Sequence, residues 1–176
     1  SGLADGPVAP AWVGVPDNSV LRSIDGRSLV SGENPYALLQ GKAGAVVTLG
    51  ISSEPGGEIT TVRVRPIPEE RPLRYANWVG SNRRFAAERT EDRVGYLHLP
   101  DMDGEGLSMF GKLFYPQVKK DAMIVDVRDN GGGFVSQMII ARLARRPWAY
   151  GQPRHGAVET YPAMVLDGPM VVLINE

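Results

Sequence analysis

One stretch of the sequence restricts the possible folds more than any other. Residues 122–127 form a nearly continuous apolar run, which is typical of a strand buried on both faces of a sheet. Three glycines, Gly131, Gly132 and Gly133, follow shortly after the run, and residues 134–143 then place apolar side chains at helical spacing. The stretch therefore predicts a buried strand, a glycine loop and a helix, in that order.

The same alternation continues on both sides of this stretch. Residues 94–99 read as a strand that Pro100 ends, and residues 106–118 read as a helix. Residues 170–174 are again fully apolar and predict another buried strand. Alternating strands and helices connect by crossovers and build a mostly parallel sheet. The second half of the chain is therefore expected to be an α/β unit.

The first half has a different pattern, with short strands separated by turns. Residues 21–24 alternate apolar and polar side chains before the turn signal Asp25-Gly26, and residues 45–53 and 60–67 predict two further strands. Asn34-Pro35 is typical of a helix start, so a short helix is expected there. This region is expected to be a small β-rich module, which makes the whole chain α+β.

A proline-rich seam separates the two patterns. Three prolines lie near residues 66–72, and residues 73–88 follow with apolar side chains at helical spacing. Gly80 weakens this helix by about 1 kcal/mol relative to alanine. The sequence therefore predicts two packed units joined by a bridging helix.

Composition excludes several classes of function. The net charge of −1 gives no basic surface for nucleic acid or an anionic membrane, and no apolar run approaches the roughly 20 residues that span a bilayer. There are no cysteines, which excludes disulfides, zinc–thiolate sites and cysteine catalysis. Their absence fits a reducing cytoplasm, and a cysteine-free periplasmic protein is the alternative. The chain starts at Ser1 rather than Met and finishes in what reads as an incomplete strand, so both ends are expected to be cut.

The glycine loop is the sharpest candidate for chemistry. Glycines between a strand and a helix let the backbone take positive φ, and their N–H groups favour a negative oxygen. Three interpretations stay open on the loop alone: a strained turn without a ligand, an oxyanion hole for acyl transfer, or a phosphate site. Neither phosphate-binding glycine motif is present, because no lysine follows the glycines and the next residues are Phe134-Val135-Ser136.

Other polar residues have simpler structural explanations. Ser136 lies in the first turn of a helix, where serine commonly bonds the backbone, and no G-x-S-x-G elbow surrounds it. His98 in a strand and His155 in a loop are expected to be structural rather than catalytic. Asp101 and Asp103 are a weak metal signal, and Asp126 is expected to order the loop that follows it. No metal and no cofactor are predicted.

The sequence resembles the core of tricorn-like serine peptidases, which belong with the C-terminal-processing, or tail-specific, peptidases. The residues that carry the resemblance are 94–102, 124–137 and 171–176, with a linker match at 71–84 and a looser PDZ-like match around 25–29. The resemblance implies an incomplete PDZ-like module at residues 1–67, a linker and bridging helix at 68–92, and the first part of a crotonase/ClpP-like catalytic domain at 93–176.

The resemblance also implies roles for particular residues. Gly133, and after it Gly132, would supply a backbone donor of the oxyanion hole, and Gly131 and Phe134 would contact the substrate. The serine nucleophile would lie a few residues beyond the Asn175-Glu176 pair and the histidine base before Ser1, so the chain alone would be inactive. Peptides would be the substrates and the enzyme a cytoplasmic homo-oligomer. The alternative is a non-catalytic PDZ-type peptide-binding module.

Overall fold

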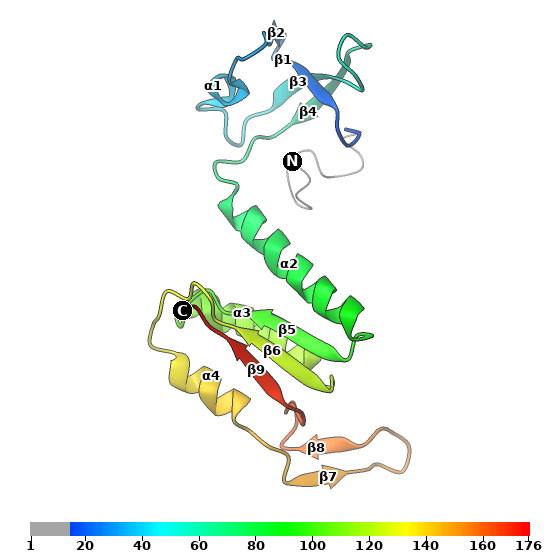
Figure 1. Cartoon of the computed structure of the whole chain (residues 1–176), viewed down its shortest axis with the longest axis vertical. Coiled ribbons are helices and arrows are strands. Elements are labelled where there is room, and N and C mark those ends of the chain that lie inside the picture. The colour runs from blue at the N-terminus through cyan, green and yellow to red at the C-terminus, as the bar shows by residue number, and fades with distance from the viewer. Residues whose placement is uncertain (1–14) are drawn as a thin grey trace. The chain divides into compact units, whose positions relative to one another are not determined.

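The structure, a computed structural model, describes residues 15–176. It is a mixed α/β chain with two compact units, and the boundary between them falls between Trp78 and Val79, inside helix α2 (Arg71–Arg89) (Figure 1). The bridging helix predicted at residues 73–88 is therefore present and slightly longer than expected. Each unit is described below by itself.

The first unit contains an antiparallel sheet in the strand order β2-β1-β3-β4. Its elements are β1 (Val20–Ile24), β2 (Arg27–Ser28), α1 (Pro35–Leu39), β3 (Val47–Ser52) and β4 (Thr60–Val64). The side chain of Asn34 accepts a hydrogen bond from the Tyr36 N–H (3.0 Å), which confirms the predicted helix start. Alternate residues of the strands face inward and form a small core: Ile24, Val47, Ile51, Val62 and Val64.

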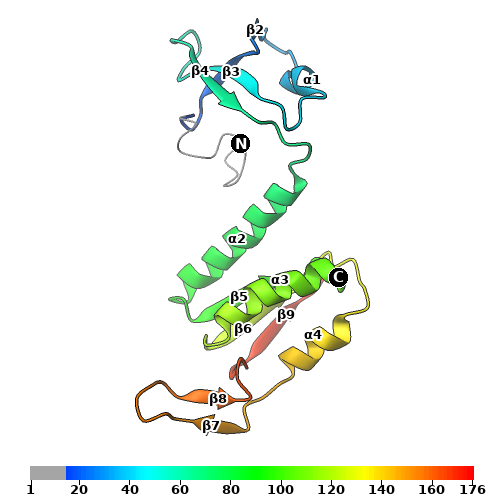
Figure 2. The ribbon, with the colours of Figure 1, turned by 180° about the vertical axis from the view of Figure 1, so that it is seen from behind.

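The second unit is built on a parallel sheet in the order β5-β6-β9, as the alternating pattern predicted. The strands are β5 (Val94–His98), β6 (Ala122–Asp126) and β9 (Met170–Leu173). Helix α3 (Gly104–Phe114) lies across one face of this sheet (Figure 2). The core of this unit contains Leu97, Leu99, Phe110, Phe114, Val118, Met123, Val125, Ile139 and Leu166.

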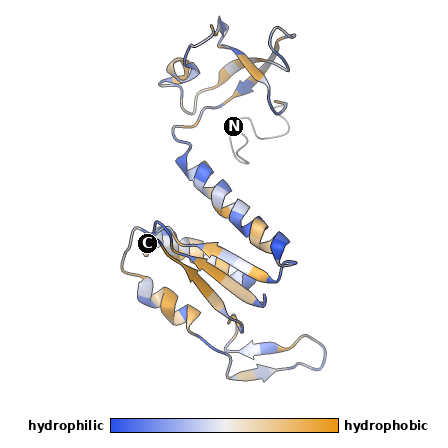
Figure 3. Cartoon of the chain, viewed as in Figure 1, coloured by the Kyte–Doolittle hydropathy of each residue, from blue (hydrophilic) through white to orange (hydrophobic). Residues whose placement is uncertain are grey.

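Strand β9 is the least covered strand of this sheet. It pairs only with β6 among the described residues, and Figure 3 shows it as one of the most hydrophobic segments. Val171 is 57% exposed and Val172 55% exposed, although both were expected in a buried strand. The apolar run correctly predicted a strand, but its burial on both faces is wrong for the described residues, because no described segment covers Val171 or Val172.

Helix α4 (Ser136–Leu143) begins two residues later than the predicted range 134–143. The Phe134 N–H donates to Asp103 Oδ1 (3.2 Å) and the Val135 N–H donates to the Met102 carbonyl oxygen (2.7 Å). These bonds to another segment hold both residues in the loop. The side chain of Phe134 is consequently 95% exposed instead of joining the buried helix face.

Two further features were not expected from the sequence. The predicted helix at residues 106–118 is α3 followed by a short 3₁₀ helix, Tyr115–Gln117, which includes Pro116. Residues beyond α4 form a small hairpin of β7 (Ala149–Gly151) and β8 (Glu159–Tyr161). Each strand of the hairpin is only three residues long, too short to show a periodic pattern.

Two glycines of α3 provide a matched test of the packing. A Cβ at Gly106 would lie 2.0 Å from the Asp101 carbonyl oxygen, whereas a Cβ at Gly111 would meet nothing within 4 Å. We expect Gly106→Ala to destabilise the unit by about 1–3 kcal/mol through overpacking, and Gly111→Ala to stabilise it by about 1 kcal/mol. Native-state hydrogen exchange at β6 amides measures both. Equal effects of the two variants would contradict this packing.

Candidate functional site

The glycine loop leaves β6 at the carboxyl edge of the parallel sheet. The Val127 N–H still donates to the Leu173 carbonyl oxygen (2.9 Å), so the loop proper starts after this residue. Ligand sites of open α/β sheets lie at the carboxyl ends of the strands. The loop therefore lies where sheets of this kind have their ligand-binding sites.

Hydrogen bonds hold this loop against the segment between β5 and α3. Gly131 N–H donates to the Pro100 carbonyl (2.9 Å), and Met102 N–H donates to the Gly132 carbonyl (2.7 Å). Gly132 N–H is taken by the side chain of Asn130 (2.8 Å), whose amide nitrogen donates to the Leu99 carbonyl (2.8 Å). Together with the contacts of Phe134 and Val135, these bonds fix the path of the loop on both sides of its last glycine.

Gly133 has the one backbone N–H between residues 127 and 135 that makes no hydrogen bond within the described part of the chain. Its φ is +140°, a conformation that side chains rarely adopt. A Cβ there would lie 2.3 Å from the Met102 carbonyl oxygen and 2.6 Å from Asp103 Cγ. Glycine is required at this position by both backbone conformation and space, and its donor is left available.

A buried carboxylate anchors the start of the loop. Asp126 is 0% exposed, and its oxygens accept bonds from Arg128 Nε (2.9 Å), Arg128 Nη2 (2.6 Å) and the Arg128 backbone N–H (3.1 Å). The hydroxyl of Tyr96 donates to the same carboxylate (2.7 Å) and accepts from Asn82 Nδ2 (3.0 Å). The prediction that Asp126 orders the following loop is confirmed by these contacts.

The electrostatics of this cluster favour the ionised carboxylate. Burial alone would raise the pKa of Asp126, but the hydrogen bonds from Arg128 and Tyr96 outweigh it and lower the pKa to about 2. Burial, followed by the bond to Asp126, raises the pKa of Tyr96 to about 12. The bond to Asp126 also raises the pKa of Arg128. Asp126 is therefore negative and Tyr96 neutral at pH 7.

The loop is also joined to the residues that follow β9. The Asp129 N–H donates to Asn175 Oδ1 (2.6 Å), and Asn175 Nδ2 donates to Asp129 Oδ1 (3.0 Å). Sequence reasoning assigned no contact to Asn175, to Asn130 or to Tyr96. Short polar side chains next to glycines and at strand ends are the available signal, because Asn and Asp commonly bond nearby backbone.

The two aspartates that gave a weak metal signal bond backbone N–H groups. Asp101 Oδ1 accepts from the N–H groups of Asp103 (2.8 Å) and Gly106 (2.7 Å), which organises the first turn of α3. Asp103 Oδ1 accepts from Phe134, so this residue also supports the glycine loop. In the part of the chain that is described, no group of three or more His, Cys, Asp or Glu residues is arranged to hold a metal ion.

The remaining candidates do not form a nucleophile–base pair. His98 is buried, and its Nε2 lies 2.8 Å from the Arg128 carbonyl oxygen, which gives it a structural contact. His155 lies in the exposed connection between β7 and β8. Across residues 15–176, no hydrogen bond joins Ser136 Oγ to either histidine. Among the same residues, no helix has the length and apolar character needed to cross a membrane.

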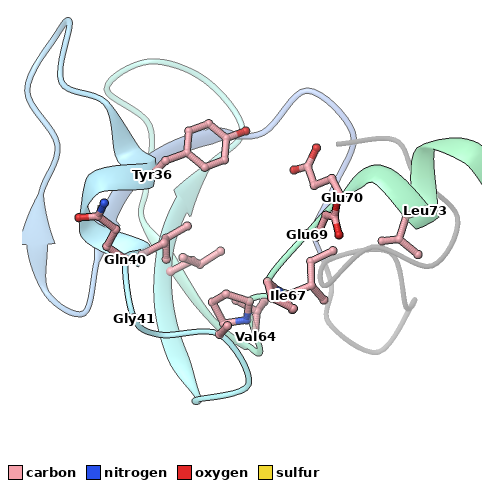
Figure 4. Close-up of a pocket in the computed structure, with 13 residues that line it drawn as sticks. Tyr36, Gln40, Gly41, Val64, Ile67, Glu69, Glu70 and Leu73 are labelled. Atoms are coloured by element: carbon pink, nitrogen blue, oxygen red, sulfur yellow. The ribbon is translucent and has the colours of Figure 1, made fainter.

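The first unit contains a separate cavity of about 650 Å³. Figure 4 shows Tyr36 of α1 and Gln40, which follows α1, on one side, and Glu69, Glu70 and Leu73 opposite them. The other residues that line it are mostly apolar: Leu39, Gly41, Ala43, Leu49, Val64, Pro66, Ile67 and Pro68. An apolar cavity with a few polar groups at its margin is typical of a binding pocket.

Comparison with known proteins finds peptidases similar to this chain. The sequence model of peptidase family S41 matches residues 93–176. Tricorn protease of Thermoplasma acidophilum is 37% identical over 161 residues, which cover 92% of this chain and 15% of that protein. Tricorn protease homolog 1 of Streptomyces coelicolor is 35% identical over 173 residues, covering 98% of this chain and 16% of the relative.

A solved structure agrees with these relatives. The crystal structure of the tricorn protease superimposes with a TM-score of 0.85 at 36% identity, over 97% of this chain and 16% of that chain. The chain thus spans about one-sixth of the length of the proteins it matches. The family match covers the glycine loop and the strands around it, so residues 93–176 match peptidase family S41, and the chain as a whole is similar to tricorn-type proteases.

Proposed function

We propose that this chain is part of a serine-type peptidase and supplies the oxyanion loop of its active site. The observation that carries the proposal is the backbone N–H of Gly133, which makes no hydrogen bond within the described residues, in a loop whose neighbouring N–H groups are all bonded. Acyl transfer needs donors that are already placed where negative charge develops on the carbonyl oxygen. Gly133 is therefore the first donor that we assign.

Gly132 is a weaker choice for the same role, because its N–H already donates to Asn130 Oδ1. Phe134, with its exposed side chain next to Gly133, and Gly131 are proposed to contact the substrate. In this mechanism a serine attacks the peptide carbonyl, a histidine accepts the serine proton, and Gly133 N–H binds the resulting oxyanion. We propose that the serine and the histidine lie outside residues 1–176, because no such pair is present among the described residues.

Labelling with a fluorophosphonate tests this assignment. The isolated chain is expected to stay unlabelled and to hydrolyse no fluorogenic peptide, because it lacks the attacking serine. A longer form with the sequence that flanks the chain is expected to be labelled at a serine beyond Glu176 and to cleave peptides. Mass spectrometry identifies the labelled residue. Labelling of Ser136 or another serine of this chain, or no labelling of the longer form, would sink the proposal.

A second candidate function concerns the first unit alone. The cavity between α1, β3, β4 and the start of α2 favours a non-catalytic, PDZ-type peptide-binding module, because its apolar lining suits a peptide side chain. Titration of the chain with a library of short peptides, followed by NMR at Leu39 and Val64, tests this binding, and the labelling of the longer form distinguishes the two functions. Shifts at these residues support peptide binding, and this function needs no serine beyond Glu176.

The finer description of the fold, the location and the working form rests on the resemblance of the sequence to tricorn-like peptidases. We propose that the first unit is a partial PDZ-like module and the second the first part of a crotonase/ClpP-like catalytic domain. We propose peptides as substrates and a cytoplasmic homo-oligomer as the working form. Nucleic acid is not proposed as a partner, because the net charge of the chain is −1.

A further inference from the structure

The contact between Asp129 and Asn175 joins two segments that are 46 residues apart in sequence. Strands β6 and β9 are parallel neighbours, with Asp126 opposite Leu173 at their last pair. Both strands therefore release the chain at the same edge of the sheet. Asp129 lies in the loop that follows β6, and Asn175 lies two residues after the end of β9.

The chemistry of the contact is specific to an amide facing a carboxylate. The Asn175 carboxamide accepts from the Asp129 backbone N–H and donates to the Asp129 carboxylate at the same time. An aspartate at position 175 has no donor, and an alanine has neither group. Asp129 itself has a positive φ of +57°. We refer to this two-bond contact as the Asp129–Asn175 clasp.

The Asp129–Asn175 clasp contributes little to the free energy of unfolding. Both residues are exposed, so water competes for each bond and the contribution to folding is small. Its geometrical effect is larger, because Asp129 immediately precedes Asn130, whose side chain holds the N–H of Gly132. One short path of bonds therefore leads from the chain leaving β9 to the residue just before Gly133.

We propose that Asn175 is a positioning residue, which sets the chain that leaves β9 in register with the N–H of Gly133. This inference rests on the proposed function, since it concerns a serine supplied beyond Glu176. A nucleophile carried by that chain has to approach the carbonyl whose oxygen Gly133 binds. Misplacement by about 1 Å lowers turnover by about 10²-fold in well-ordered sites. The clasp acts on this distance and makes no contact with substrate.

Hydrogen exchange in the chain itself tests the clasp without any activity. Asn175→Ala is expected to speed exchange of the Asp129 amide by about fivefold, the effect of one exposed hydrogen bond, and to leave β6 amides unchanged. Asn175→Asp keeps the acceptor but sets two carboxylates against each other, so it is expected to open the clasp as well. In the double variant Asp129→Asn with Asn175→Asp, the amide at position 129 donates to the carboxylate at position 175. This bond has the reverse direction of the native side-chain bond, and the variant is expected to restore protection of the residue 129 amide from exchange. Unchanged exchange in Asn175→Ala would show that the clasp does not form.

Kinetics of the longer, serine-containing form test the positioning role. Asn175→Ala and Asn175→Asp are expected to lower kcat by about 10–100-fold with KM nearly constant, and the reversed pair to recover most of the loss. Asp129→Asn alone is expected to be mild, because its side chain still offers an acceptor to Asn175. If exchange reports an opened clasp while kcat stays at the wild-type value, Asn175 is not a positioning residue. If the wild-type longer form cleaves no peptide, the proposed function fails instead, and the exchange result still decides the clasp.

Discussion

Replacement of the Gly133 peptide amide by an ester is expected to lower kcat of the longer peptidase by about 10²–10³-fold, the loss typical of one oxyanion donor. The ester removes the N–H that makes no hydrogen bond within the described residues and adds no side chain. KM is expected to change little, because the donor acts mainly on the charge of the transition state. Semisynthesis of the protein with glycolic acid at position 133, followed by steady-state kinetics, measures the effect.

An ester at Gly132 is the matched control. It removes an N–H that the side chain of Asn130 already uses. It weakens the Gly131 carbonyl, whereas the ester at Gly133 weakens the Gly132 carbonyl, which accepts from the Met102 N–H, so exchange of the Met102 amide is compared in both variants. A loss of no more than about tenfold is expected from one weakened internal bond. Equal losses for the two esters would show that the loop is merely structural. Gly133→Ala is a poor test, because its Cβ would clash with the Met102 backbone and displace the loop.

Arg128→Met is expected to destabilise the second unit by about 3–5 kcal/mol, since it leaves the buried Asp126 carboxylate without its counter-ion. Arg93→Met is the control, because Arg93 and Asp121 form an exposed pair at 3.8 Å that is worth at most about 1 kcal/mol. Native-state hydrogen exchange at β6 amides measures both free energies of unfolding. Similar small losses of free energy of unfolding in both variants would show that the buried cluster contributes little to stability.

The same cluster gives a pH signature with a defined sign. The pKa of Asp126 is lowered to about 2, below its ordinary value of 3.8, so the associated stability is present above about pH 4 and is lost between about pH 4 and pH 2. The pKa of Tyr96 is raised to about 12, so its contribution is lost as the pH rises from about 10 to 12. The difference in free energy of unfolding between wild type and Arg128→Met is expected to become smaller as the pH falls from about 4 to 2. A constant difference down to pH 2 would contradict the lowered pKa.

Much of the fold follows from local patterns in the sequence. The apolar runs at β6 and β9 and the alternation around α3 predicted a parallel sheet, because buried parallel strands lack the alternation of half-exposed ones. The start of α4 was placed two residues early, because Phe134 fits the helical period. Its N–H is instead bound by Asp103, which is 31 residues away in sequence. Periodicity carries no information on such a distant bond.

The candidate site shows the same division between local and distant information. Three glycines after a buried strand are visible in the sequence and indicate a backbone that approaches another group closely. Gly133 keeps an N–H without a hydrogen bond in the described chain because the neighbouring N–H groups are bound by other residues. Pro100 and Asp103, in another segment at the sheet edge, and the side chain of Asn130 accept them. No local pattern in the sequence predicts a contact of Asn175. Its bond to Asp129 exists because β6 and β9 are neighbours.

The uncovered edge at β9 has a consequence for the chain in solution. Its apolar residues lie on a short strand whose outer backbone groups pair with no other described strand, and such an edge is a template for cross-chain pairing. A net charge of −1 provides almost no long-range repulsion between copies. The isolated chain is therefore expected to self-associate through this edge even while it stays folded, and charged substitutions on β9 are expected to raise its solubility.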